Sequence, residues 1–490
     1  MRKVFHNQMS IGEVSIGDIE ISIKSRDDVP RILLGLQYIY KDNGIRKELF
    51  ELLDSVIPSH IDKNNGRPGM ELWRVFVMST LRVHLDWDYD RLEEMVNNHR
   101  VIRLMMGHGD YDATCYERKT LRNNLRLLTP EVLDKINQLI VKVGHKEVKK
   151  KEETLRGKCD SFVVETNVHF PTDINLLFDA IRKTIELTAR LCDECNVEGW
   201  RQYKHNIRGV KKLYRKAQRS KTGRKKDKTS EGSRVKKTHK EYINEVSCFI
   251  QKAKNTIIEL QNSDAKKNIF LDVEVSEIQK FIDHAERQID QIARRVLNGE
   301  VIPHHEKTFS LFEPHTKWIN KGKIGLLTEL GLRVCIMSDQ YKFILHHQVA
   351  EKEADAQLAV PMVKETKSRY KNLISVSFDR GFYSAYNAKK LEELLEEFAL
   401  PKKGYRSQKD KEVEHSDQYK RSAYAHSRVE SDINHLEQHG LDICLDHGIE
   451  GFKRYIAIAT TSANLGTLGG IIKKKQIKKL KRASKILNSS

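Results

Sequence analysis

The sequence contains no uninterrupted apolar run of about 18 residues, the length that a transmembrane helix needs, so we expect no membrane span and no membrane partner. The first residues, Met1 to His6, do not open an apolar stretch like that of a signal peptide. The seven cysteines are scattered, which is typical of proteins in the reducing cytosol. Cys192 and Cys195 have metal-like spacing but lack a second Cys or His pair at a usual distance, which favours two thiols near a helix end over a zinc site. These absences predict a cytoplasmic protein.

Acidic residues are too few to balance the basic ones. The chain contains 87 Lys and Arg but only 68 Asp and Glu, which gives a net charge of +19. This excess favours a polyanionic partner, most simply nucleic acid. A soluble protein of lysine-rich composition would show the same balance. The 490 residues are sufficient for about three domains of roughly 150 residues each.

The positive charge is concentrated in two segments. Residues 201–240 contain 17 Lys or Arg and two acids, a net charge of 17 − 2 = +15. We expect a loop here, because Lys221 to Lys228 has no apolar pattern. Residues 471–490 predict a basic C-terminal tail. Such runs are often only solvated surface, but we expect these two to contact phosphates through Arg224, Lys225, Lys226, Lys473, Lys474 and Lys475.

The first half of the chain predicts mostly helices, preceded by a short N-terminal segment that is not helical. Residues 1–30 alternate apolar and polar side chains, which predicts a hairpin or an arm. Residues 31–150 have helical spacing and predict an all-α DNA-binding domain, with helix-turn-helix elements as one option and plain helical packing as the other. Residues 199–299 predict a basic helical insertion. Two apolar ladders in it predict an antiparallel helical hairpin, formed by Ile243, Val246, Ile250, Ala253, Ile257 and Leu260 and by Ile278, Ile282, Ala285, Ile289, Ile292 and Val296.

The segments 151–198 and 300–470 have the pattern of an α/β domain. The elements follow the order of a ribonuclease H-like core, with the 199–299 insertion between its first two strands. They are strands at 161–164, 325–339, 342–349 and 374–378, a helix at 353–369, and then helix, short strand and helix up to residue 440.

Three of these elements each carry one carboxylate. Asp160 opens the first strand, Asp379 ends the strand before Gly381, and Glu430 lies on an amphipathic helix. Bunched carboxylates repel each other unless cations hold them. Two divalent ions about 3.5–4 Å apart can clamp the attacking and leaving oxygens of a phosphodiester. We therefore expect a site for Mg²⁺, with Mn²⁺ as a substitute.

Spacing alone leaves other interpretations open. Asp379 could instead cap the next helix, and Glu430 could be a surface charge. Glu165, Asp173 and Asp179 are rivals of Asp160. Asp432 lies about 200° around the helix from Glu430, so we expect it to face away from the site.

Four ordered blocks carry a resemblance to a known family. The chain resembles bacterial insertion-sequence DDE transposases, in the branch filed among unclassified insertion sequences and related to transposases with a Tyr-Arg-Glu-Lys signature. The blocks are Gly157 to Asp173, Glu313 to Lys323, Phe378 to Ser384 and Val429 to Asp442, and Gly66 to Gly69 and Ala463 to Gly469 also fit. The resemblance implies that Asp160, Asp379 and Glu430 are the catalytic and metal-binding triad.

The chain departs from the Tyr-Arg-Glu-Lys signature itself. Ala423, His426 and Glu437 stand where Tyr, Arg and Lys would be. Roles attached to that signature, including a hairpin intermediate, are therefore not transferred. We expect His426 and Arg428 to contact DNA phosphates near the triad.

The resulting expectation is a transposase that cuts DNA at the ends of an insertion sequence and joins the 3′-OH ends to target DNA. Its DNA partners would be terminal inverted repeats and target DNA. Paired ends require two active sites, so we expect a homodimer on DNA in the nucleoid-associated cytoplasm. The alternatives are a ribonuclease H-like endonuclease without strand transfer and a catalytically idle DNA-binding derivative.

Overall fold

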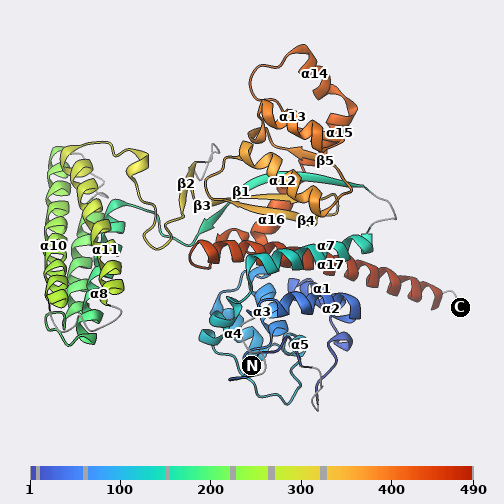
Figure 1. Ribbon diagram of the computed structural model, residues 1–490, viewed down its shortest axis with the longest axis horizontal. Coiled ribbons are helices and arrows are strands. Elements are labelled where there is room, and N and C mark those ends of the chain that lie inside the picture. The colour runs from blue at the N-terminus through green and yellow to red at the C-terminus, as the bar shows by residue number, and fades with distance from the viewer. Residues whose placement is uncertain are drawn as a thin grey trace. The chain divides into compact units, whose positions relative to one another are not determined.

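The computed structural model describes residues 2–6, 12–58, 65–148, 154–220, 228–262, 271–320 and 328–487. The chain divides into two compact units (Figure 1). Unit 1 comprises Met1–Asn167 and Ile319–Ser490, and unit 2 comprises Val168–Trp318. Unit 1 is a mixed α/β structure, and unit 2 is built mainly from helices.

The N-terminal part of unit 1 is helical, as its apolar spacing predicts. Three of its helices begin at an aspartate whose side chain accepts a hydrogen bond from the first turn: Asp27 before α1, Asp42 before α2 and Asp88 before α4. The helices are α1 (Asp28–Lys41), α2 (Asn43–Asp54), α3 (Leu72–His84), α4 (Tyr89–Asn98), α5 (Arg100–Met105), α6 (Arg118–Leu125) and α7 (Pro130–Val148).

The segment before α1 is an arm rather than a hairpin. Among its described residues there is no strand, and Ile16–Asp18 forms one turn of 3₁₀-helix. Ile16 and Ile19 are buried. The Gln37 amide of α1 donates hydrogen bonds to both of their carbonyls, at 3.0 and 2.8 Å. These contacts replace the cross-strand ladder that a hairpin would need.

Helix α17 (Ile449–Leu487) is the central helix of unit 1. Ile449–Ile486 is long and apolar enough to cross a membrane, but 83% of its apolar window is buried within the protein, as in the core helix of a soluble protein. Glycines allow α1 to approach it closely. A Cβ on Gly469 would lie 1.9 Å from the Arg31 carbonyl oxygen, and one on Gly35 would lie 2.4 Å from that of Leu465. Residues 471–487 continue this helix, which corrects the expectation of a separate tail.

The mixed sheet has seven strands. They are β1 (Leu155–Thr166), β2 (Lys317–Asn320), β3 (Thr328–Ser338), β4 (Ile344–Ala350), β5 (Leu373–Phe378), β6 (Glu397–Ala399) and β7 (Ile443–Cys444). β3 pairs antiparallel with both β1 and β4, whereas β5 runs parallel to β1 and β6 parallel to β5. β7 extends the pairing of β1 at its far end. The predicted order of strands and helices in 325–440 is confirmed.

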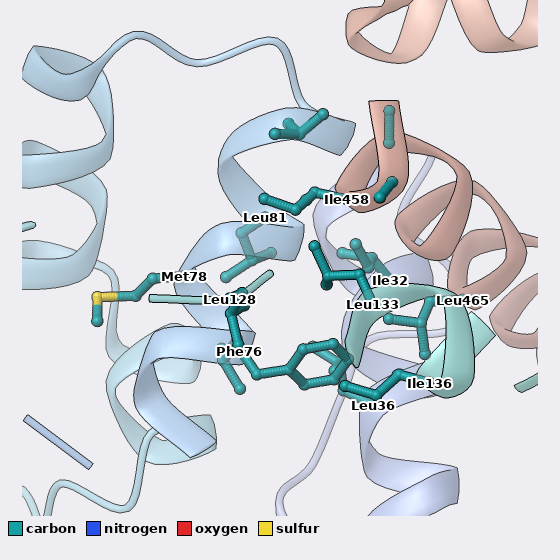
Figure 2. Packing of buried hydrophobic residues seen from close by; sticks show 14 of the residues in the cluster. Ile32, Leu36, Phe76, Met78, Leu81, Leu128, Leu133, Ile136, Ile458 and Leu465 are labelled. Atoms are coloured by element: carbon teal, nitrogen blue, oxygen red, sulfur yellow. The ribbon is translucent and has the colours of Figure 1, made fainter. Parts of the chain in front are cut away.

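Each face of the sheet is covered by its own apolar core. Phe162 and Val334 join the cluster formed by α1, α3, α7 and α17, part of which is drawn in Figure 2. Cys159 and Phe378 join a second cluster with α12 (Asp355–Arg369) and α13 (Ala385–Leu394). The helices of residues 31–150 therefore share a core with the sheet, which corrects the expectation of a separate domain.

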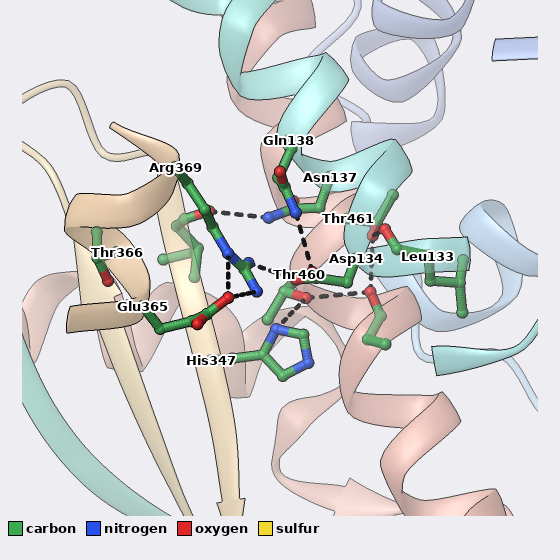
Figure 3. Close-up of polar contacts among 12 residues, drawn as sticks. Leu133, Asp134, Asn137, Gln138, His347, Glu365, Thr366, Arg369, Thr460 and Thr461 are labelled. Atoms are coloured by element: carbon green, nitrogen blue, oxygen red, sulfur yellow. Dashed lines mark hydrogen bonds and ion pairs between the residues drawn. The ribbon is translucent and has the colours of Figure 1, made fainter. Parts of the chain in front are cut away.

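Polar contacts also tie the N-terminal helices to the sheet and α12. Arg369 of α12 bridges Asp134 of α7, at 2.8 Å, and Glu365 (Figure 3). The Asn137 amide donates to the carbonyl of Ile344 on β4, at 3.1 Å. After β6 the chain forms α14 (Gln408–His415), α15 (Asp417–His426) and α16 (Val429–Leu436).

Unit 2 is larger than the predicted insertion. Its helices are α8 (Asp173–Glu194), α9 (Tyr203–Ser220), α10 (Lys228–Asn262) and α11 (Leu271–Ile292). Helix α8 belongs to this unit because it buries its apolar face with the other three helices in one core. The boundaries 199 and 299 are therefore corrected to Val168 and Trp318.

The two apolar ladders lie within this unit, as predicted, but they do not pack only on each other. Helix α10 contacts mainly α9, and α11 contacts mainly α8. The expected two-helix hairpin is thus corrected to a four-helix arrangement. Residues 201–240 are also not one loop, because α9 and α10 occupy most of them; Arg224, Lys225 and Lys226 lie outside the described residues.

The ladder can be tested with two isoleucines of α10. Ile250 is 4% exposed and Ile258 is 57% exposed. Ile250→Asp should destabilise the protein by about 3–5 kcal/mol, because it removes an aliphatic contact and buries a charge. The matched control Ile258→Asp should cost less than about 1 kcal/mol. Urea denaturation followed by circular dichroism measures both, and equal losses would contradict the assignment of the buried face.

Candidate functional site

Asp160 and Asp379 are brought together by the pairing of two parallel strands. Cys159 of β1 is in register with Phe378, the last residue of β5; Asp160 is the next residue of β1, and Asp379 directly follows the end of β5. Parallel strands lie about 4.8 Å apart. Because Cys159 faces the α12 core, alternation along β1 turns Asp160 toward the opposite face. The strand pairing thus places two carboxylates side by side at one end of β5.

Asp379 also has the capping role that was its alternative interpretation. It is the N-cap of a single 3₁₀ turn, Arg380–Phe382, and its carboxylate accepts from the Gly381 amide at 3.4 Å. The side chain remains exposed. The cap orients the carboxylate without burying it.

Glu430 joins the two aspartates from α16. Val429 and Leu436 of this helix are buried, while Glu430 is exposed. The charges of Asp379 and Glu430 both act on Asp160. Burial, followed by the negative charges of Asp379, Asp355 and Glu430, raises the pKa of Asp160 to about 7. The three carboxylates singled out from the sequence therefore share one electrostatic environment.

Asp355 is a fourth carboxylate that sequence reasoning missed. It accepts a hydrogen bond from the Ser161 hydroxyl at 2.7 Å and lies 3.3 Å from the Arg333 guanidinium. A Cβ on Gly381 would lie 3.3 Å from Asp355 Oδ2 and 3.7 Å from Asp379 Oδ2, so both carboxylates flank this glycine. Asp355 is the first residue of α12, a common place for an aspartate. Its position in the sequence therefore carries no functional signal.

The donor set fits a hard divalent cation in chemistry. Carboxylate oxygens are the ligands that Mg²⁺ prefers, and Mn²⁺ accepts the same donors. Burial and, after it, the neighbouring negative charges raise the pKa of Asp160, and a bound cation would offset the repulsion among these charges. In the part of the chain that the structure describes, no three acidic, His or Cys side chains converge closely enough to form a metal site as they stand. Asp160, Asp379 and Glu430 are the residues that would hold the ion.

Asp432 of α16 is buried. Its carboxylate pairs with the Lys158 ammonium and accepts from the Ser338 hydroxyl at 2.8 Å. Lys158 is two residues before Asp160, and Asp432 is two residues after Glu430. This ion pair holds the helix that carries Glu430 against the strand that carries Asp160.

His426, at the end of α15, lies beside the carboxylates. Burial lowers its pKa, and the charges of Asp379 and Glu430 only partly offset that effect. The imidazole is therefore neutral at pH 7. Its Nδ1 is buried with no hydrogen-bond partner among the described residues. Arg428 is exposed just before α16, two residues from Glu430.

Two of the three lysines expected to bind DNA in the C-terminal segment have partners within the protein. Lys473 donates to the Ser25 carbonyl at 2.6 Å, and Lys475 pairs with Glu147 at 2.5 Å. Lys474 is exposed. The intramolecular contacts of Lys473 and Lys475 compete with any phosphate.

A concave basic surface on α9 and the start of α10 was also missed from the sequence. Its volume is about 710 Å³, and no acidic residue lines it. Lys216 is paired with Glu241 at 2.6 Å. The sequence does contain a signal for this surface: basic residues three and four positions apart, which lie on one face of a helix. It was overlooked because the segment was interpreted as a loop. The basic residues lining this α9 surface are Arg208, Lys211, Lys212, Arg215, Lys216, Arg219 and Arg234.

Comparison of the chain with protein-family models, curated proteins and solved structures gave no match. The functional assignment therefore rests on the site itself.

The raised pKa of Asp160 has a measurable consequence for stability without metal. The folded carboxyl keeps its proton up to about pH 7, whereas the ordinary value is 3.8. Between these values the folded state holds more protons, so stability falls as pH rises. Asp160→Asn should therefore raise the melting temperature in EDTA at pH 8 by roughly 1–5 °C, since a unit of more than 300 residues shifts by only about 1–2 °C per kcal/mol.

The gain should shrink as the pH falls toward 3.8, below which the parent carboxyl is mostly protonated in both states. Adding Mg²⁺ at pH 8 should stabilise the parent more than the variant. Scanning calorimetry over this pH range measures both effects. A variant that melts below the parent at every pH would refute the assigned cause of the shift.

Proposed function

We propose that this protein is a metal-dependent DDE transposase. It would cleave DNA at the ends of an insertion sequence and join the freed 3′-OH ends to target DNA. The observation that carries the proposal is the register of β1 and β5, which sets Asp160 beside Asp379 in the electrostatic environment that also contains Glu430. A ribonuclease H-like core is part of this proposal.

The strand arrangement supports that core. Two antiparallel neighbours, β3 and β4, lie on one side of β1, and two parallel neighbours, β5 and β6, lie on the other. The carboxylates come from the first strand, the fourth strand of this set and a later helix. This is the arrangement that the sequence pattern predicts for two-metal phosphodiester chemistry.

When bound, Mg²⁺ would polarise the attacking hydroxyl and stabilise the leaving 3′-oxygen. Asp160, Asp379 and Glu430 would provide the negatively charged oxygens that bind the cation. Asp160 must lose its proton before it can act as a ligand, and its pKa near 7 makes that step pH-dependent within the physiological range. His426 is neutral beside the site and would orient a scissile phosphate or a water by hydrogen bonding. Arg428 would supply positive charge to a flanking phosphate.

DNA as the partner is supported by the charge distribution. The net charge is +19, and the α9 surface gathers basic side chains with no acid in its lining. Phosphate contacts of this kind position a duplex without reading its sequence. Terminal inverted repeats and target DNA would both bind, and paired ends would require a homodimer on DNA.

The two rival functions differ in their products. An endonuclease without strand transfer would cut a terminal-repeat duplex but leave no joined product. A catalytically idle derivative would bind DNA without cutting, which the separation of the described carboxylates also permits. Incubating the protein with labelled terminal-repeat DNA, target plasmid and Mg²⁺ separates all three, because strand transfer gives a branched or joined product.

Glu430→Gln tests the third carboxylate. The change keeps the shape of the side chain but removes the charge that a cation needs, so DNA cleavage should fall by roughly 10³-fold or more while DNA binding persists. Asp160→Asn and Asp379→Asn should give similar losses that do not add. Glu437→Gln, on the next part of the same helical stretch, is the matched control and should cleave like the parent. Cleavage by Glu430→Gln at the parental rate would contradict the assignment.

The α9 surface can be tested through the salt dependence of DNA binding. Replacing Arg208, Lys211 and Arg215 with Gln should weaken binding to all DNA sequences alike. The slope of log K against log salt should fall by up to about 2.7, or 0.9 for each lost phosphate contact. Lys254, Lys280 and Arg287 on α10 and α11 give a charge-matched control. An unchanged slope in the α9 variant would leave this surface as solvated charge.

A further inference from the structure

Unit 2 contains a second cavity that is unrelated to the carboxylates. It lies between the start of α8, the end of α11 and residues 302–318, and its volume is about 350 Å³. All of the lining residues belong to unit 2. This size is within the range of small-ligand pockets, which is roughly 300–1,000 Å³.

Aromatic rings form one wall of this cavity. Phe309 lies between His304 and Trp318, with ring centroids 5.3 and 5.8 Å away. All three residues line the cavity and none is fully buried. Partly exposed rings in a concave wall offer a stacking surface to a flat ligand.

Gln288 of α11 contributes an unpaired side-chain amide to the cavity. The residue is 0% exposed and lines the cavity. Neither its amide nitrogen nor its amide oxygen has a hydrogen-bond partner among the described residues. The neighbouring Gln291 is satisfied, since its amide donates to the Glu306 carbonyl at 2.7 Å. A buried amide lacking both partners would pair with a ligand that offers an acceptor and a donor side by side.

The charged residues around the cavity further limit the chemical class of ligand that would fit it. Arg295 is held by two hydrogen bonds to Asp173, at 2.6 and 2.8 Å, so it closes the cavity wall with little net charge. Lys307 is exposed beside the aromatic wall and offers a positive charge. A flat ring with adjacent donor and acceptor groups, linked to a phosphate, matches all of these features.

We propose that this cavity binds a nucleotide. The base would stack on Phe309 and Trp318 and pair its polar edge with the Gln288 amide, and the phosphate would approach Lys307. The ligand has two possible sources, a free nucleotide or an unpaired nucleotide of a DNA strand. The inference goes beyond the proposed transposition chemistry, because no residue of the carboxylate site takes part.

Calorimetric titration of the full chain with the four nucleoside 5′-monophosphates, ribose 5-phosphate and inorganic phosphate tests the site. Nucleotides should bind and the two base-free phosphates should not. Fluorescence of 2-aminopurine, placed in a single-stranded overhang or inside a duplex, identifies the source. Quenching in the overhang without binding of free monophosphates would assign the cavity to DNA, and binding of free monophosphates would assign it to free nucleotides.

Two variants separate ligand binding from folding. Gln288→Leu removes both unpaired polar atoms, so it should raise the melting temperature of the free protein while weakening nucleotide binding by roughly tenfold or more. Phe309→Leu should weaken binding through loss of the stacking surface. The control Gln251→Leu replaces an exposed glutamine of α10 and should leave binding unchanged.

The proposal is overturned if ribose 5-phosphate binds as well as the nucleotides, if no nucleotide binds in either form, or if Gln288→Leu binds like the parent. Glu430→Gln should retain nucleotide binding, so a failure of this inference and a failure of the proposed function are distinguishable.

Discussion

The buried ion pair between Lys158 and Asp432 is the constraint on which the carboxylate arrangement depends. Their side chains are only 7% and 2% exposed, so each charge is stabilised mainly by the other. Breaking a buried pair by removing one partner costs about 3–5 kcal/mol, whereas replacing both partners can be neutral. The main effect of the pair is therefore to position α16 relative to β1, rather than to add stability. It links β1 to α16, and the Ser338 hydroxyl adds β3 to the same point.

This link explains how an exposed glutamate can be held near two strand residues. Glu430 has no packing of its own to fix it, because the buried face of α16 is made by Val429 and Leu436. Asp432 fixes the rotation of the helix, and the strand pairing fixes Asp160 and Asp379. Burial is the main cause of the raised pKa of Asp160, and the negative charges of Asp379, Asp355 and Glu430 add to it. Site geometry and charge repulsion thus have the same structural origin.

The sequence predicted the strands and helices of the core well, because their periodicity is local. Asp160 and Asp379 could be singled out because each borders an apolar strand pattern, and the family resemblance favoured Asp160 over its rivals. Asp355 could not, since its role arises only when Ser161 and Arg333 approach it from other strands. The boundary of unit 2 was missed for a similar reason: α8 has an apolar face that would suit either unit, and only packing decides between them. The α9 surface was hidden because high charge density outweighed a weak apolar stripe of Val210 and Ala217.

The insertion of unit 2 into the sequence between β1 and β3 has a consequence for how the chain folds. Strands β1 and β3 are paired along eight residues from Lys158–Ser338 to Glu165–Gly331, yet all of unit 2 separates them in sequence. Such distant pairing is slow when the intervening chain is a random coil, because closing a long loop costs entropy. A four-helix arrangement built from local contacts can form first and shorten the effective loop. During synthesis, β1 would therefore remain unpaired with β3 until unit 2 has folded. The sheet would form only after the helical unit is complete.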